Sequence, residues 1–413
     1  MGITAKIFIG MVTGAAFGLI LKFVPTHNIP MIQEFFTEGL FFVVGQIFLR
    51  LLQMLVVPVV FLSLVCGTAG LGDLRRLGRV GGKTLFLYLV TTLIAVALGC
   101  LFAGLIEPGA GFVLSKTEAL VTTETPSLRD TLVSIFPRNP IESFAKGDML
   151  PIIVFAIFLG VATTLSGKAG ESTLKGFNAL NEVMMKLVDL VISLSPVGVF
   201  CLVAKVFSEQ GLDVMLPLGK YFCTVLLVLL IQLAMVYSFL LKVIGRLSPI
   251  KFFKKFNEVM IFAFSTASSN ATIPVTLDVI EKRLGVKNSV ASFTIPLGAT
   301  VNMDGTAIMQ GVATLFVAQA YGIHFGLKEY VMVILTATLA SIGTAGVPGV
   351  GLVMLAMVFQ QVGLPLEAIG IIMAVDRPLD MARTVVNVTG DGVVSCVVAK
   401  SEKELDFNTY ESE

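Results

Sequence analysis

Long apolar segments separated by short charged loops make up the first 246 residues of this chain. Those long enough to cross a bilayer lie at about 5–24, 36–71, 82–107, 149–167, 174–208 and 213–243. Beyond residue 246 the apolar arms are too short to span, and small polar runs that contain proline interrupt them. The pattern therefore predicts six spanning helices followed by a half of a different kind.

Two polar runs in that second half predict helical hairpins that enter and leave the membrane on one side. Irregular backbone at membrane depth is tolerated only where protein covers it or where it lines a cavity. The first run, SSNATIP at 268–274, separates arms at about 252–266 and 275–284, and the second, SIGTAGVPGVG at 341–351, separates arms at about 329–340 and 352–363.

The segment 289–320 between the hairpins carries NMDGT at 302–306, and we expect this polar cluster to break its helix mid-membrane. A hairpin followed by a helix thus occurs twice, at 252–320 and 329–400. The first unit starts inside and the second outside, so the two form an inverted repeat, which places substrate and coupling ions near the midplane. The predicted fold class is an all-α membrane protein with eight transmembrane helices, two re-entrant helical hairpins and inverted repeats.

Basic residues gather in every second loop and fix the expected orientation. The positive-inside rule places such loops, and with them both termini, in the cytoplasm. The intervening loops are mixed or acidic. The basic residues are Arg75, Arg76, Arg79 and Lys83 after the second span, Lys168 and Lys175 after the fourth, and Lys242, Arg246, Lys251, Lys254 and Lys255 after the sixth.

Composition narrows the class of protein further. Of 413 residues, 55% are hydrophobic and 14% are charged, which is typical of an integral membrane protein and not of a soluble enzyme. A net charge of +1 argues against a nucleic-acid partner. The five cysteines are odd in number and lie in apolar runs, so we expect buried thiols, and the two histidines offer no metal-binding spacing.

The stretch DMARTVVNVTGD, at 380–391, carries its polar groups on one helical face. At about 100° per residue, Arg383, Thr384, Asn387 and Asp391 all fall within about 60° of Asp380. Each charge at a bilayer centre costs about 2.5–3.5 kcal/mol, so this face must meet protein, water or a ligand and not lipid. The stripe is therefore the leading candidate for a functional site.

Arg383 and Asp380 suit an acidic amino acid. A guanidinium fork holds a carboxylate with two hydrogen bonds, and an aspartate one turn away can hold an ammonium group. The hairpin tips would supply backbone N–H groups and hydroxyls for the second carboxylate. The alternative is that Arg383 and Asp380 neutralise each other.

A second set of polar residues predicts a site for a hard cation, which prefers oxygen ligands. Buried carboxylates without a basic partner need a cation or a proton; sodium fits best, and a proton stays open. Hydroxyls on a helix also bond their own backbone, which is the alternative for the three on the third span. The candidates are Asp304, Asp391, Asn302, Asn387, Tyr88, Thr91 and Thr92.

The stretch 263–400 resembles the dicarboxylate/amino-acid:cation symporters, the glutamate transporter family. The matching pieces are SSNATIP, PLGATVNMDGTA, ASIGTAGVPG and DMARTVVNVTGD, and a weaker resemblance includes MLVVPVVFLSLVCG at 54–67 and SPVGVFCLVAKV at 195–206. The resemblance implies a homotrimer in the cell (inner) membrane, in contact with lipid, with one transport pathway per protomer. It also implies that a transport domain moves against a scaffold as an elevator.

The resemblance implies a division of the chain into scaffold and transport parts. The parts are scaffold and trimerisation helices 1–2 at 1–75, transport-domain helix 3 at 76–110, an extracellular or periplasmic loop at 111–148, scaffold helices 4–5 at 149–209, transport-domain helix 6 at 210–247, hairpin 1 at 248–286, broken helix 7 at 287–324, hairpin 2 at 325–365, helix 8 at 366–400 and a cytoplasmic tail at 401–413.

The resemblance also implies roles for single residues. In the substrate site, Arg383 would bind the side-chain carboxylate and Asp380 the amino group, with Thr384, Asn387, Thr306, Ser268, Ser269, Ala267, Val347 and Gly351 around them. One sodium site would use Gly298, Asn302, Asn387 and Asp391, a second Tyr88, Thr91, Thr92, Asn302 and Asp304 beside Met303, and a third Thr300, Ser341, Ile342 and Thr344.

The chain departs from the family pattern at a few positions. Members usually carry a second arginine near the substrate, where this chain has Ala267 and Met381, and Arg377 is the candidate substitute. Gln310 replaces the acidic residue of proton-coupled animal members, which argues against their mechanism but leaves bacterial proton coupling open.

We therefore expect a secondary active symporter in which inward sodium flux drives uptake of L-aspartate or L-glutamate. A C4-dicarboxylate symporter is the first alternative, because AVDR at 374–377 resembles such relatives, and a proton-coupled glutamate/aspartate symporter is the second. An ion channel is a candidate from another class. An intramembrane enzyme is disfavoured, since no Ser/His pair or metal cluster lies at membrane depth.

Overall fold

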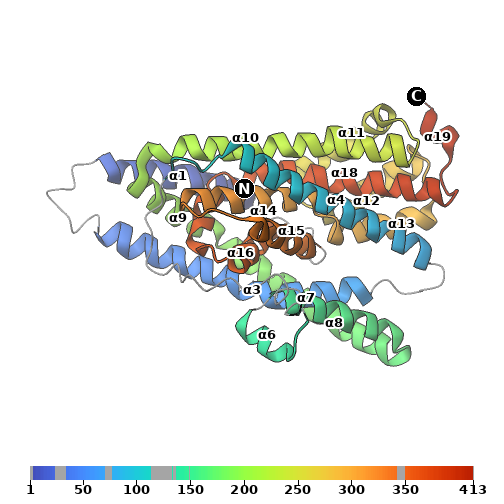
Figure 1. The fold of residues 1–413 in the computed structure, drawn as a ribbon, viewed down its shortest axis with the longest axis horizontal. Coiled ribbons are helices and arrows are strands. Elements are labelled where there is room, and N and C mark those ends of the chain that lie inside the picture. The colour runs from blue at the N-terminus through green and yellow to red at the C-terminus, as the bar shows by residue number, and fades with distance from the viewer. Residues whose placement is uncertain are drawn as a thin grey trace.

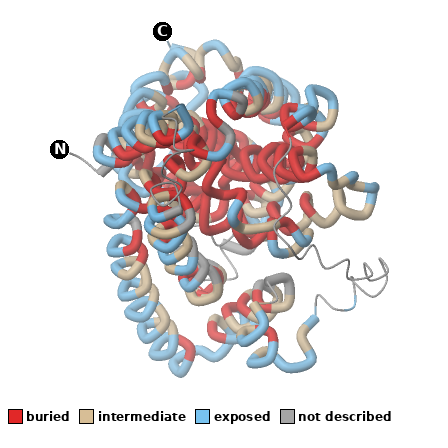
Figure 2. Tube along the Cα trace, turned by 90° about the vertical axis from the view of Figure 1, so that its left-hand side faces the viewer, coloured by how far each residue is buried: buried red, intermediate tan, exposed pale blue. Residues whose placement is uncertain are grey.

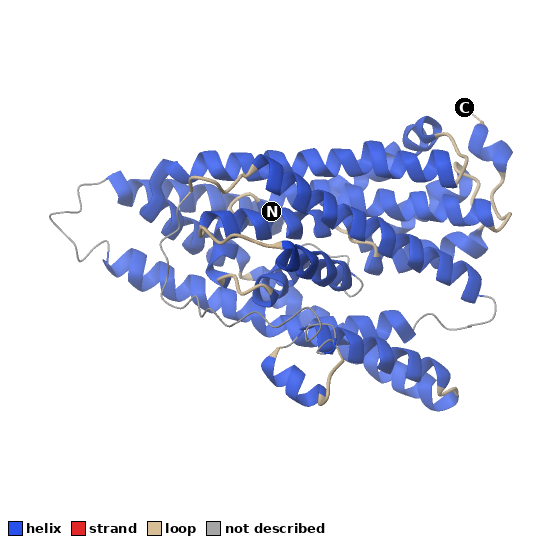
Figure 3. Cartoon of the chain, in the orientation of Figure 1, coloured by secondary structure: helices blue, strands red, loops and turns tan. Residues whose placement is uncertain are grey.

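The computed structural model describes residues 3–23, 34–69, 77–112, 133, 136–147, 149–341 and 349–412. In this part of the chain every regular element is a helix (Figures 1 and 3), and sheet pairing is limited to one isolated bridge between Val286 and Leu405. The predicted all-α class is confirmed.

Three of the described helical segments are long and apolar enough to cross a membrane, and a fourth joins them if the bent pair α8–α9 counts as one span. The three are Lys6–Phe23, Arg79–Ile106 and Met215–Ile244. The expected total of eight transmembrane helices and two re-entrant hairpins stays a prediction.

The first half of the chain contains a pair of closely packed helices, α1 and α9. Glycines at four-residue spacing on α1, Gly10, Gly14 and Gly18, face the α9 backbone, and a Cβ at Gly14 would lie 2.6 Å from the Phe200 carbonyl oxygen. Small residues at this spacing allow helix backbones to approach closely. The elements are α1 (Ile3–Phe23), η2 (Glu34–Phe41), α3 (Phe42–Ala69), α4 (Leu77–Ile106), α6 (Pro140–Lys146), α7 (Met149–Leu165), α8 (Lys168–Ser193), α9 (Ser195–Gln210) and η3 (Gly211–Val214).

The second half packs around two central helices, α14 and α18, which are buried over most of their length. Figure 2 shows the buried residues gathered in the middle of one bundle. In the view of Figure 1, α10 and α11 lie along its upper edge, while α3, α7 and α8 lie along the lower one. The elements are α10 (Met215–Ile231), η4 (Gln232–Tyr237), η5 (Leu240–Ile244), α11 (Pro249–Thr266), α12 (Ser269–Lys282), α13 (Asn288–Val301), α14 (Asp304–Ala320), α15 (Leu327–Ser341), α16 (Val350–Gln361), η6 (Leu366–Ala368), α17 (Ile369–Met373), α18 (Asp376–Ser401) and α19 (Phe407–Glu411).

The first polar run is mostly helical, which differs from the expected irregular tip at 268–274. The turn between α11 and α12 is only Ala267 and Ser268, and α12 begins at Ser269. Ser268 caps the helix, since its Oγ accepts a hydrogen bond from the Ala271 N–H at 3.2 Å. Ala267 takes the left-handed conformation, with φ 49°, that ends many helices. A capping serine thus lets a polar sequence start a helix directly.

The predicted break in the helix 289–320 is present. Asn302 and Met303 have non-helical backbone angles and separate α13 from α14. The helix expected at 366–400 is also divided, because Val375 interrupts it and α18 begins at Asp376. Pro378 lies in the first turn of α18, where its missing N–H has no intrahelical partner to lose.

Candidate functional site

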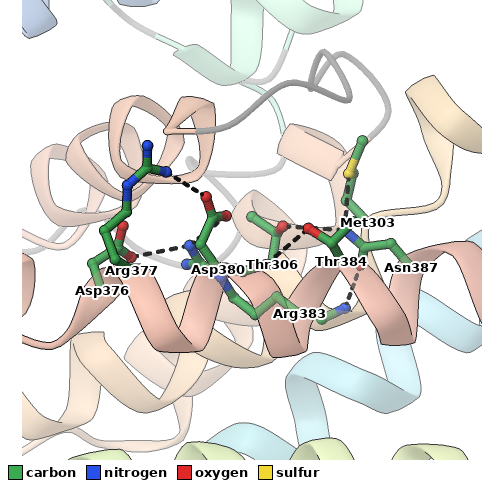
Figure 4. A network of polar contacts seen from close by, with 9 residues as sticks. Met303, Thr306, Asp376, Arg377, Asp380, Arg383, Thr384 and Asn387 are labelled. Carbon is green, nitrogen blue, oxygen red and sulfur yellow. Dashed lines mark hydrogen bonds and ion pairs between the residues drawn. The ribbon is translucent and has the colours of Figure 1, made fainter. Parts of the chain in front are cut away.

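Four charged side chains in the first two turns of α18 form a continuous chain of ion pairs (Figure 4). Arg383 Nη2 donates to Asp376 Oδ1 at 3.0 Å and to Asp380 Oδ1 at 2.9 Å. Arg377 Nη1 donates to the other oxygen of Asp380, Oδ2, at 3.0 Å. Two guanidinium groups thus balance two carboxylates, and the cluster is neutral as a whole.

Helical spacing places these charges together at the start of α18. Arg377 and Asp380, and Asp380 and Arg383, are three residues apart, which makes them neighbours on one face. All four side chains are buried, and Arg383 is fully so. The sequence alternative of mutual neutralisation is therefore what the structure contains, while the role of Arg383 and Asp380 in binding a ligand stays a prediction.

Arg383 keeps donors that no group in the described part of the chain satisfies. Its Nε and Nη1 are buried and have no hydrogen-bond partner there. Gly351 packs closely against this side, since a Cβ at that position would be 3.4 Å from Arg383 Nη1 and 3.2 Å from Thr306 Cγ2. A buried guanidinium with unused donors costs free energy unless an acceptor occupies that side. These two nitrogens are therefore the donors that Arg383 can offer to a ligand.

Asn387 ties α18 to the break between α13 and α14. Its Oδ1 accepts a hydrogen bond from the Gly305 N–H at 2.7 Å, and its Nδ2 lies 3.5 Å from Thr306 Oγ1 and 3.2 Å from Met303 Sδ (Figure 4). Thr384 instead donates to the Asp380 carbonyl of its own helix at 2.8 Å. The contacts of Asn387 thereby fix the position of the broken helix relative to the charged face of α18.

Asp391 and Asn302 form the first group of oxygen ligands. Asn302 Nδ2 donates to Asp391 Oδ1 at 2.9 Å and to the Asn387 carbonyl at 3.0 Å. Both side chains are essentially inaccessible to solvent. Gly298 makes the space, because a Cβ there would collide with the Asp391 carboxylate and would lie 2.6 Å from the Tyr88 hydroxyl. The predicted set Gly298, Asn302, Asn387 and Asp391 is brought together.

Asp304 is the centre of the second group. Thr92 Oγ1 donates to its Oδ1 at 2.6 Å, and Thr91 Oγ1 lies 3.4 Å from the same oxygen. The Tyr88 hydroxyl makes its hydrogen bond elsewhere, since it donates to the Thr294 carbonyl at 3.0 Å. Thr91 and Thr92 therefore join Asp304 as predicted, and Tyr88 lies closer to Gly298.

The two groups fit a hard cation better than a transition metal. The described residues contain no group of three or more His, Cys, Asp or Glu suited to a metal ion. They contain instead two fully buried carboxylates, Asp304 and Asp391, with neutral donors around them, and a buried Asn302 Oδ1 that no described group satisfies. Carboxylate, amide and hydroxyl oxygens are the ligands of hard ions such as sodium.

Several predicted residues are not joined to these groups. Thr300 Oγ1 donates to the Leu297 carbonyl of its own helix at 2.9 Å, and Ser341 Oγ does the same to Thr338 at 2.8 Å. Ala267, Ser268 and Ser269 are buried at the turn between α11 and α12. Ile342, Thr344 and Val347 lie outside the described residues. The third sodium site and the substrate contacts of both hairpin tips stay predictions.

Sequence reasoning missed two residues that contact Asp304 from another helix. Gln232 Nε2 donates to Asp304 Oδ2 at 3.0 Å, and Tyr237 Oη donates to the same oxygen at 2.8 Å. Both are fully buried. A glutamine within the long apolar stretch 213–243 was the available signal, since a buried amide requires polar partners.

A cavity lies beside Asp376 and Arg377, at the N-terminal end of the charge cluster. Apolar side chains of α1, α3 and α9 form one side of it, and Asp376 and Arg377 belong to the other. This arrangement gives the cluster a void on its Arg377 side. The lining residues are Ile7, Phe48, Ser195, Val199, Gly349, Leu352, Met373, Asp376 and Arg377.

Known proteins resemble this chain along almost its whole length. A proton/sodium-glutamate symport protein of Bacillus caldotenax is 35% identical over 98% of this chain and 96% of that protein. A proton/glutamate-aspartate symporter of Escherichia coli (strain K12) is 36% identical over 88% of this chain and 85% of that protein. A C4-dicarboxylate transport protein of Bacillus subtilis (strain 168) is 30% identical over 88% of this chain and 87% of that protein.

The family comparison agrees with these relatives. The sequence pattern of the sodium:dicarboxylate symporter family matches residues 3–401. The resemblance seen in the sequence is confirmed, and an enzymatic role is excluded because the family consists of transporters. The buried charges on α18 and the oxygen groups around Asp304 and Asp391 thus belong to a transporter embedded in a membrane: this chain is a member of the sodium:dicarboxylate symporter family.

Proposed function

We propose that the chain is a secondary active symporter that takes up L-aspartate or L-glutamate and is driven by an inward flux of sodium. The observation that carries the proposal is Arg383, a fully buried guanidinium with two unused nitrogen donors. It lies on the same helix as Asp391, whose buried carboxylate receives only neutral hydrogen-bond donors among the described residues. An anionic substrate and a cation would satisfy both.

The substrate would bind beside the first turns of α18, which carry Arg383 and Asp380. Its side-chain carboxylate would accept hydrogen bonds from Arg383, beside Thr306 and Gly351. Its ammonium group would take over part of the hydrogen bonding of Asp380, which Arg383 and Arg377 now share. The proposal keeps Thr384, Asn387 and the hairpin turns, including Ser269, as the remaining contacts.

Sodium would occupy the Asp391–Asn302 group and the Asp304 group. When bound, it supplies the positive charge that lets both carboxylates stay ionised in a dry interior. Proton coupling is the alternative, since both of these similar proteins, a proton/sodium-glutamate symport protein and a proton/glutamate-aspartate symporter, carry the proton in their names.

The proposed architecture is the elevator inferred from the sequence. The scaffold at 1–75 and 149–209 would hold a homotrimer together in the cell (inner) membrane, with both termini in the cytoplasm. The remaining helices and both hairpins would carry the substrate across. In this architecture the cavity lined by residues of α1, α3, α9 and the start of α18 would lie between the two parts.

Uptake into proteoliposomes tests the function directly. We expect radiolabelled aspartate to accumulate when an inward sodium gradient is imposed at equal pH on both sides, and excess unlabelled glutamate to compete. Accumulation driven by a pH gradient without sodium would replace sodium with protons. The absence of saturable counterflow under either gradient would contradict the symporter proposal.

A C4-dicarboxylate symporter is the second candidate, and one contact favours it. Arg377 already forms an ion pair with Asp380, with 3.0 Å between Nη1 and Oδ2. The charge of Asp380 therefore stays compensated when the substrate has no ammonium group. The C4-dicarboxylate relative shows that this substrate class occurs among similar proteins.

The Asp380→Asn variant separates the two candidates. Loss of a hydrogen bond to a charged group costs about 1.5–3 kcal/mol, so the affinity for aspartate should fall roughly 10- to 150-fold. The affinity for succinate should not fall, because succinate has no ammonium group and Arg383 loses a competing carboxylate. Competition against labelled substrate in proteoliposomes measures both values, and equal losses would remove the ammonium role from Asp380.

A further inference from the structure

Gln232 and Tyr237 approach Asp304 from a helix that carries none of the predicted cation ligands on this face. Gln232 Nε2 and Tyr237 Oη converge on one carboxylate oxygen, Oδ2, while Thr92 Oγ1 occupies the other, Oδ1. Gln232 Nε2 also lies 3.4 Å from the Thr91 carbonyl, next to the threonine pair. Both carboxylate oxygens of Asp304 therefore accept hydrogen bonds, each from a different helix.

A local change of helix type makes this convergence possible. In an α-helix, residues five apart point about 140° away from each other. The segment Gln232–Tyr237 is a π-helix, η4, in which residues five apart come onto one face. Short π-helical segments inside longer helices occur frequently at functional sites. Here the π-helix directs two polar side chains of an otherwise apolar span at the same carboxylate.

Tyr237 also joins the Asp304 group to α18. Its hydroxyl lies 2.8 Å from Asp304 Oδ2 and 3.0 Å from the Val386 carbonyl on α18. Gly390 allows this approach, because a Cβ there would lie 2.5 Å from both Tyr237 Oη and Asn302 Nδ2. The helix that Tyr237 contacts is the one that carries Asn387 and Asp391.

We propose that Gln232 and Tyr237 are positioning residues for the cation at Asp304. By occupying Oδ2 they stop the carboxylate from rotating and keep Oδ1 on the side of Thr91 and Thr92. The donor that Oδ1 now has, the Thr92 hydroxyl, is itself a predicted ligand, so the ion would meet both oxygens together. The cation then meets a preformed ligand set of fixed size. The inference rests on the proposed cation coupling and adds two residues to it that are not among the predicted ligands of the ion.

Buried polar side chains also serve structure alone, so the test needs a readout that such a role would not change. Removing second-layer partners of metal ligands typically weakens metal binding 10- to 100-fold. A structural role would instead lower the unfolding temperature without sodium and leave the sodium concentration for half-maximal stabilisation unchanged.

The experiment is a sodium titration of thermal unfolding on the purified full-length protein without substrate, with choline holding the ionic strength constant. Tyr237→Phe and Gln232→Met remove only the hydrogen-bonding groups and keep the side-chain size. We expect each to raise the half-maximal sodium concentration 10- to 100-fold, and Tyr237→Phe to have no further effect in an Asp304→Asn background. Tyr221→Phe is the matched control, since Tyr221 is equally buried on α10 and its hydroxyl has no hydrogen-bond partner among the described residues.

The outcomes separate the inference from the proposed function. A wild-type protein that sodium does not stabilise would contradict sodium coupling, and the inference with it. A wild-type response together with variant midpoints within twofold of the Tyr221→Phe control would overturn the inference alone. A variant that fails to fold leaves the other single variant to decide, because the two groups act on the same oxygen.

Discussion

Replacing Arg383 with alanine is expected to abolish high-affinity binding of acidic substrates while leaving stabilisation by sodium detectable. Removing one partner of a buried, hydrogen-bonded charge pair costs about 2–5 kcal/mol, which corresponds to a loss of affinity of roughly 30- to 4,000-fold. The guanidinium is fully buried, so the substitution removes charged donors from a site that is closed to bulk solvent. Calorimetric titration of aspartate at saturating sodium measures the loss.

The same substitution leaves the buried Asp376 without its charge partner, so its effect on folding must be separated from its effect on binding. Asp380 loses one hydrogen bond but keeps its ion pair with Arg377. The double variant Asp376→Asn, Arg383→Gln keeps the net charge of the cluster and should fold better than the single variant, yet it should bind aspartate no more tightly. Arg79→Ala is the matched control, since Arg79 is largely exposed and pairs with Glu402 at the end of α18. Aspartate affinity equal to wild type in the double variant would remove Arg383 from the substrate site.

The charged face of α18 was predictable because helical periodicity alone determines it. Arg383, Asp380 and Asn387 share one face of the helix wherever that helix lies in the fold. Burial of that face follows from the cost of placing charge in lipid. The break at Asn302 was predictable for a similar reason, since a polar cluster with glycine interrupts an apolar helix. The motif resemblance then indicated that these two elements meet.

Other features depend on geometry that the sequence pattern does not contain. The contact of Gln232 and Tyr237 with Asp304 requires a π-helix, and a helical wheel at 100° per residue places the two on different faces. The tip of the first hairpin was expected to be longer than Ala267 and Ser268, because a run of small polar residues suggests a loop whereas a serine cap starts a helix.

The internal pairing of Arg383 with Asp376 required the fold as well. Asp376 lies seven residues before Arg383, so the sequence placed it beside the same face without indicating which acid the guanidinium would choose. The interruption of the helix at Val375 makes Asp376 the first residue of α18, near the positive end of the helix dipole, where a carboxylate is favoured.

Replacing Asp391 with asparagine, which removes its charge, is expected to remove most of the stabilisation by sodium without destabilising the sodium-free protein. The substitution keeps the size of the side chain and a polar partner for Asn302, while it eliminates a buried charge whose desolvation is unfavourable. The sodium-free unfolding temperature should therefore equal or exceed that of wild type. This combination distinguishes a cation ligand from a residue that only supports the fold.

The size of the effect follows from linkage between binding and folding. At a sodium concentration of about 100 times the dissociation constant, a single site stabilises the folded state by about 2.7 kcal/mol, and a 100-fold weaker site leaves about 0.4 kcal/mol. Thermal unfolding followed across a sodium titration measures the difference, with Asp189→Asn as a control because Asp189 is exposed and pairs with Lys186. An Asp391→Asn protein with the wild-type sodium midpoint would show that the ion binds elsewhere. A lower unfolding temperature without sodium would show that the Asp391 charge is already compensated within the fold, because only a compensated carboxylate stabilises the state in which it is buried.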